Sequence, residues 1–172
     1  MAGDARQTDG MAGEENLPEG FTLGLALVDA VPVALFCLAA IMLGLRLSSP
    51  LFVAGSVVAF VGGALKVGWK LVIALARRNV PWLSRQMRYV MPAGFALMLV
   101  GLLTCGVGWD QVAAAVAAFP SCVLLAAWLA CMVAMGWFAG HLSRTDARAN
   151  WVEQATNAVG QACLLAALLL MP

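Results

Sequence analysis

The chain has 172 residues, of which 63% are hydrophobic and 11% are charged, and its mean hydropathy is +0.90. Soluble domains are about 45–50% apolar, so this composition excludes an ordinary soluble protein and predicts an integral membrane protein. The formal net charge is only +1. Because nucleic-acid-binding proteins carry a basic excess, we expect no nucleic-acid partner.

The sequence lacks the motifs of metal, cofactor and nucleophile chemistry. Its five cysteines lie in apolar runs without a C-x-x-C pair, and the single histidine, His141, does not accompany them at metal-ligand spacing. Neither a phosphate-binding glycine loop nor a G-x-S-x-G motif occurs. We therefore expect no metal, no cofactor and no catalytic residue, and the sequence does not favour an enzyme.

Residues 1–20 are polar, acidic and rich in glycine, so we expect a disordered cytoplasmic tail ahead of a single membrane domain over residues 21–172. Five apolar stretches of membrane-spanning character follow, at about 21–45, 51–76, 91–106, 120–142 and 147–170. The predicted fold is an all-α, polytopic membrane helix bundle of about five transmembrane helices.

Two features indicate how these spans begin and pack. Ser49 can cap the second span, because Pro50 stands at its first helical position. The second and fourth spans also carry small residues four positions apart, which allows close helix packing within the bundle. These residues are Gly55, Ala59 and Gly63 in the second span and Gly136 and Gly140 in the fourth.

Residues 77–89, from Arg77 to Tyr89, separate the second and third spans. Arg85 and Arg88 are i,i+3 neighbours, and Trp82 and Tyr89 are aromatics of the kind found at headgroup level. This pattern predicts a short interfacial amphipathic helix that binds anionic lipid. A plain basic loop is the alternative.

Four ionisable residues fall inside the predicted spans: Asp29 in the first, Lys66 and Lys70 in the second, and Glu153 in the fifth. Counted at about 1.5 Å per residue, all four lie roughly 9–16 Å deep from the same membrane face. A lysine at the centre of a membrane helix costs about 2.5–3.5 kcal/mol, so we expect these charges to pair. Lys66, the deeper lysine, is expected to pair with Asp29 or Glu153, whereas Lys70 can extend its ammonium to the headgroups.

The fifth span begins with polar residues on one helical stripe, which continues inward from Glu153 through Asn157 to Gln161. Such groups would lack partners in lipid, so they should face the protein interior. The predicted ligand- or ion-binding site therefore consists of Asp29, Lys66, Lys70, Glu153, Asn157 and Gln161.

Arginines in the short connections predict the orientation. Two connections on one side are basic, whereas the opposite side carries only Arg46. By the positive-inside rule the N-terminus is cytoplasmic and the C-terminus outside, in a membrane of the bacterial cytoplasmic type. The basic residues are Arg77, Arg78, Arg85 and Arg88 in one connection and Arg144 and Arg148 in the other.

The leading functional interpretation is a small membrane protein that binds or transports a polar solute or a proton through an ionisable cluster near the cytoplasmic leaflet. The alternative is a non-catalytic subunit or assembly factor of a larger membrane complex, acting through a homo-oligomer or a partner protein. A lipid-modifying enzyme is the least supported. The cluster can also be purely structural, holding three helices in register.

Overall fold

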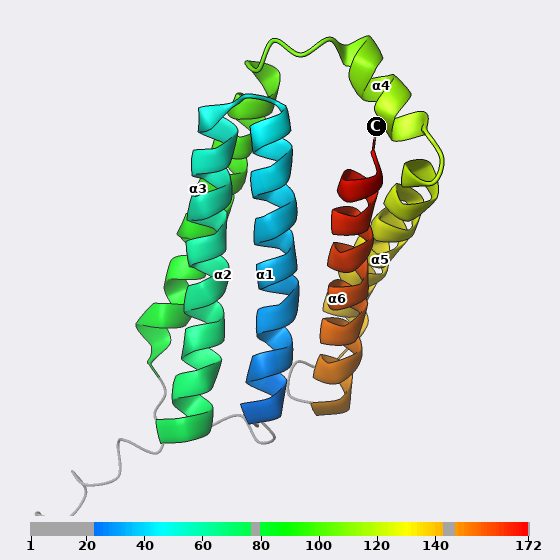
Figure 1. Cartoon of the computed structure of the whole chain (residues 1–172). Coiled ribbons are helices and arrows are strands. Elements are labelled where there is room, and N and C mark those ends of the chain that lie inside the picture. Colours follow the sequence, from blue (N-terminus) through cyan, green and yellow to red (C-terminus); the bar gives the residue numbers. More distant parts are fainter. Residues whose placement is uncertain (1–22, 77–79, 143–146, 172) are drawn as a thin grey trace, which may run out of the picture.

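The computed structural model describes residues 23–76, 80–142 and 147–171 (Figure 1). Over these residues the chain forms α-helices and no strands. The helices are α1 (Leu23–Arg46), α2 (Pro50–Ala76), α3 (Pro81–Leu103), α4 (Trp109–Ala117), α5 (Ser121–His141) and α6 (Ala147–Leu170). The predicted tail over residues 1–20 lies outside the described residues, as do Arg77, Arg78 and Arg144.

The five long helices pack side by side in the order α3, α2, α1, α6, α5. Helix α2 contacts both α3 and α1, α1 also contacts α6, and α6 contacts α5. Helices α3 and α5 stand at the two ends of this row and do not pack against each other over the described residues. The short helix α4, which packs on α5, lies in the connection that carries the chain from one end of the row to the other (Figure 1).

Four helices are long and apolar enough to cross a membrane: α1, α2, the part of α3 from Arg85 to Leu103, and the part of α5 from Ser121 to Phe138. The predicted class, an all-α integral membrane protein, is therefore supported. Helix α6 does not reach the same apolarity, because its first half carries the polar stripe from Asn150 to Gln161.

Within the segment 77–89, expected to form a separate interfacial helix, residues 77–79 lie outside the described residues and residues 81–89 belong to α3. This helix begins at Pro81 and continues through Pro92 to Leu103 without a break. Proline is tolerated inside membrane helices when the surrounding protein accommodates the missing N–H bond, so Pro92 does not start a new helix here. Arg85 and Arg88 are exposed on the first turns of α3.

The turn between α1 and α2 forms as the sequence predicts. The Phe52 amide donates to Ser49 Oγ at 3.3 Å, so Ser49 caps α2, and Pro50 is the first helical residue. Ser49 Oγ in turn donates to the Gly101 carbonyl at 3.0 Å. This one hydroxyl therefore ties the α1–α2 turn to the end of α3.

The small residues of α2 lie in close helix contacts, as expected. A Cβ on Gly55 would stand 2.6 Å from the Met98 amide nitrogen of α3, and one on Gly63 would stand 2.9 Å from the Val33 side chain of α1. The α3 backbone shows the same closeness, because a Cβ on Gly94 would lie 2.6 Å from the Ala59 nitrogen.

The corresponding prediction for the fourth span is wrong. A Cβ on Gly136 or Gly140 of α5 would meet nothing within 4 Å over the described part of the chain, and both glycines are exposed. The reason is the position of α5 at the end of the row, where α6 and α4 are the only described helices that pack against it.

The closeness of α2 and α3 predicts that Gly94→Ala destabilises the protein by about 1–3 kcal/mol, because the added methyl group meets backbone that cannot rotate away. Gly136→Ala is the matched control. It adds the same group in open space and should leave stability unchanged or raise it by up to about 1 kcal/mol through helix propensity. Thermal unfolding in nanodiscs measures both, and equal stability of the two variants would contradict the close α2–α3 crossing.

Candidate functional site

A buried ion pair joins α1 to α2. Lys70 Nζ lies 3.0 Å from Asp29 Oδ2, and each side chain is 5% exposed. The two helices are consecutive and antiparallel, so the first turns of α1 lie beside the last turns of α2 (Figure 1). The contact of Gly63 with Val33 fixes the register of the two helices. Asp29 lies one turn from Val33 on α1, Lys70 lies two turns from Gly63 on α2, and the two side chains face each other.

This pairing corrects the sequence-based expectation for the two lysines. Lys70, expected to extend towards the headgroups, is the buried partner of Asp29, whereas Lys66 is only half-buried and forms no ion pair with any described residue. Counting residues from the helix ends gave both lysines an acceptable depth. The register of α1 against α2, which such counting does not contain, selects Lys70.

Lys66 and Glu153 nevertheless belong to the same electrostatic neighbourhood. Glu153 attracts the Lys70 ammonium and Lys66 repels it, although neither is its ion-pair partner. Glu153, on the second turn of α6, is half-buried like Lys66. The cluster thus combines one closed ion pair with two further charges that have no ion-pair partner among the described residues.

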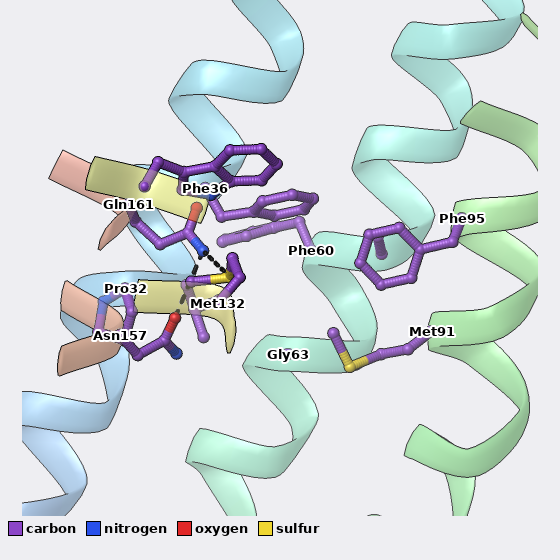
Figure 2. A pocket seen from close by; sticks show the side chains of 12 residues that line it. Pro32, Phe36, Phe60, Gly63, Met91, Phe95, Met132, Asn157 and Gln161 are labelled. Atoms are coloured by element: carbon purple, nitrogen blue, oxygen red, sulfur yellow. Dashed lines mark hydrogen bonds between the residues drawn. The ribbon is translucent and has the colours of Figure 1, made fainter. Parts of the chain in front are cut away.

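A cavity of about 260 Å³ lies deeper in the bundle, between all five long helices (Figure 2). Its polar lining consists of Asn157 and Gln161 from α6. Gln161 Nε2 donates to Asn157 Oδ1 at 3.3 Å and to Met132 Sδ at 3.9 Å. The remaining lining is mostly apolar and includes Pro32, Phe36, Phe60, Gly63, Phe95 and Trp128.

The cavity continues from the charged cluster on three helices. Pro32 follows Asp29 by one turn of α1, and Asn157 follows Glu153 by one turn of α6. On α2, Gly63 lies one turn beyond Lys66, towards the middle of the helix. Since one helical turn is about 5.4 Å, the cavity begins within one or two turns of the charges.

The six residues singled out in the sequence form two groups in the structure, a charged cluster and the polar lining of the adjacent cavity. Asp29 and Lys70 are paired, Lys66 and Glu153 act on that pair, and Asn157 and Gln161 line the cavity. Their role in binding a ligand stays a prediction. In the described part of the chain, no group of three or more His, Cys, Asp and Glu side chains is arranged to hold a metal ion.

Sequence reasoning missed the aromatic part of the lining. Phe36, Phe60, Phe95 and Trp128 come from four different helices, and each lies among other apolar residues. No spacing within one helix marks such residues. A pattern could be recognised only for Asn157 and Gln161, which are polar residues in an apolar segment.

The ion pair predicts a specific stability pattern. Lys70→Met should cost about 3–5 kcal/mol, because Asp29 would be left buried and unpaired. Adding Asp29→Asn should restore part of that loss. Lys66→Met is the matched control on the same helix and should cost much less, since Lys66 is half-buried and outside the pair.

Thermal unfolding in nanodiscs at pH 7 compares four variants with the wild type: Lys70→Met, Asp29→Asn, their double mutant and Lys66→Met. Strictly additive effects of Lys70→Met and Asp29→Asn would contradict the pairing. A loss for Lys66→Met as large as that for Lys70→Met would contradict the assignment of Lys70 as the partner.

Comparison with known protein families, with curated proteins and with solved structures gives no match to this chain. Inference about its function therefore rests on the arrangement of charged and polar side chains within the bundle. That arrangement is a closed ion pair, two neighbouring charges and a cavity lined by two amides.

Proposed function

We propose that this is a membrane protein that binds and moves a proton, alone or together with a small polar solute, through the cluster of Asp29, Lys66, Lys70 and Glu153. The observation that carries the proposal is the cavity that begins one or two turns from the buried Asp29–Lys70 pair. Ionisable residues inside membrane helices are costly and mark solute and proton paths.

A purely structural role would need only the ion pair. A pair that holds α1 and α2 in register requires neither further charges nor a cavity beside it. Here Lys66 and Glu153 lie near the pair without an ion-pair partner among the described residues, and amide groups line the adjacent cavity. These extra features support a binding site over an ion pair that only holds two helices in register.

The charges suggest how a proton would change the cluster. A proton on Asp29 neutralises its carboxylate and removes the attraction that holds Lys70. Glu153 already attracts Lys70 and offers an alternative carboxylate on α6, which packs against α1. When Asp29 binds a proton, Lys70 would pair with Glu153 on α6, and when Asp29 loses the proton, Lys70 would return to Asp29 on α1. Coupling requires a two-state element of this kind.

Proton movement can be measured in liposomes that contain the protein and an internal pH dye, under an imposed membrane potential. We expect proton flux that depends on the protein. The flux is measured with and without a small-molecule cell extract outside the liposomes, because the proton can move alone or together with a solute. Glu153→Gln should lower it by about tenfold or more, because the alternative partner of Lys70 is lost. The stability-recovered Asp29→Asn/Lys70→Met variant should lower it equally.

Gly136→Ala, which adds a methyl group in open space on α5, is the control and should retain the flux. The absence of protein-dependent flux under both conditions would contradict the proposal. So would wild-type flux in the Asp29→Asn/Lys70→Met variant, which would leave the pair a purely structural role.

We also propose that α6 is the fifth span and that the N-terminus is cytoplasmic. Helix α6 packs along both α1 and α5, as a spanning helix of the bundle would. Arg85 and Arg88, exposed at the start of α3, support contact between this end of the bundle and anionic headgroups of the cytoplasmic leaflet.

Single cysteines in a cysteine-free background test this orientation. Arg85→Cys should react with an impermeant thiol reagent only from the cytoplasmic side. Asp110→Cys, on α4 at the opposite end of the bundle, should react from the outer side. Labelling of position 85 from outside, or of position 110 only from the cytoplasm, would overturn the orientation.

One observation favours a second function, that of a non-catalytic subunit or assembly factor. Gly136 and Gly140 lie four positions apart on an exposed face of α5, with open space around both. Small residues at this spacing let a second membrane helix approach closely. A stoichiometric partner protein retained on gentle purification would support this function.

A further inference from the structure

Two residues that line the cavity each carry a buried polar atom without a partner among the described residues. Gln161 Oε1 and Trp128 Nε1 have no hydrogen bond within the described part of the chain, and both residues line the cavity. The Gln161 residue is 8% exposed. Its Nε2 is held by Asn157 and Met132, so the carbonyl oxygen is the free end of a fixed amide (Figure 2). Buried polar groups normally have a hydrogen-bond partner, so we expect a bound molecule to supply the partners of these two atoms.

The two atoms define complementary requirements. Gln161 Oε1 accepts a hydrogen bond, whereas the Trp128 indole N–H can only donate one. A hydroxyl group meets both requirements, because it donates one hydrogen bond and accepts others. The occupant therefore carries a hydrogen-bond donor and an acceptor, and a hydroxyl supplies both in one group.

The rest of the cavity fits an occupant that is uncharged and apolar apart from its hydrogen-bonding group. None of the described residues that line it is charged, and Phe36, Phe60 and Phe95 supply rings from three helices (Figure 2). The volume of about 260 Å³ lies just below the roughly 300 Å³ at which pockets for drug-sized ligands begin. The occupant is therefore smaller than a drug-sized molecule.

The helix arrangement also indicates a route of entry. Met91 and Phe95 of α3 and Trp128 and Met132 of α5 line the cavity, yet α3 and α5 do not pack together over the described residues. In a membrane the space between these two helices faces the hydrocarbon. A molecule dissolved in the bilayer can thus reach the cavity from the side.

We propose that the cavity binds a small, uncharged amphiphile whose hydroxyl donates to Gln161 Oε1 and accepts from the Trp128 indole N–H. Its apolar ring or chain lies among the phenylalanines, and it enters from the lipid between α3 and α5. This inference rests on the function proposed above and names the class of solute that the site takes.

Three fluorinated probes of matched shape test the class by fluorine NMR on the full chain in nanodiscs, with empty nanodiscs as the partitioning reference. 4-Fluorophenol carries the hydroxyl, 4-fluorotoluene replaces it with a methyl group, and 4-fluorobenzoate is charged. We expect saturable binding of 4-fluorophenol roughly tenfold tighter than that of 4-fluorotoluene, because the apolar analogue leaves both buried atoms unpaired. The charged probe should not bind saturably.

The variants locate the site. Gln161→Leu should abolish the preference for the phenol, and Trp128→Phe, which keeps a ring but removes the N–H, should reduce it severalfold. Gln154→Leu is the matched control. Gln154 also lies on α6, is 4% exposed and has an unpartnered Oε1, but it does not line the cavity. That variant should retain the preference.

Equal binding of the phenol and the toluene would overturn the inference, as would saturable binding of neither. Tighter binding of the benzoate would overturn it in favour of a charged solute. Because proton flux is measured without these probes, such a failure can be told apart from failure of the proposed function. Loss of the preference in Gln154→Leu as well would place the site elsewhere.

Discussion

The burial of Asp29 against Lys70 is the interaction on which the rest of the arrangement depends. Two ions removed from water are stable only when their geometry is good, so α1 and α2 must keep one register. The Ser49 cap fixes that register at the turn, and the contact of Gly63 with Val33 fixes it near the middle. At the far end of the two helices, the ion pair closes at 3.0 Å.

The site follows from the order of helices on either side of this pair. Small residues let α3 approach α2 on one side, and α1 contacts α6 on the other, so Glu153 comes close to the α1–α2 ion pair. Over the described residues, helices α3 and α5 end the row without packing together, so their side chains line a cavity instead of closing a core. Charges near one end and amides deeper in the bundle are therefore consequences of one packing order.

Much of this could be predicted because a charge in an apolar helix is an unmistakable signal. The helical class, the Ser49 cap and the convergence of Asp29, Lys70 and Glu153 all follow from composition, spacing and depth. The choice between Lys66 and Lys70 could not follow, since it depends on the side-chain packing that sets helix register. The aromatic lining and the open face of α5 depend on which helices are neighbours, and no pattern within one helix contains that information.

Solid-state NMR of the protein in bilayers tests the central claim, the buried pair, most directly. The chain contains two lysines, so Lys66→Arg leaves Lys70 as the single source of a lysine Nζ signal. With nitrogen-15 on lysine Nζ and carbon-13 on aspartate Cγ, the account predicts an ammonium resonance with a through-space contact to one carboxylate. That contact should disappear in Asp29→Asn. An ammonium without a carboxylate contact, or a neutral amine, would contradict the account.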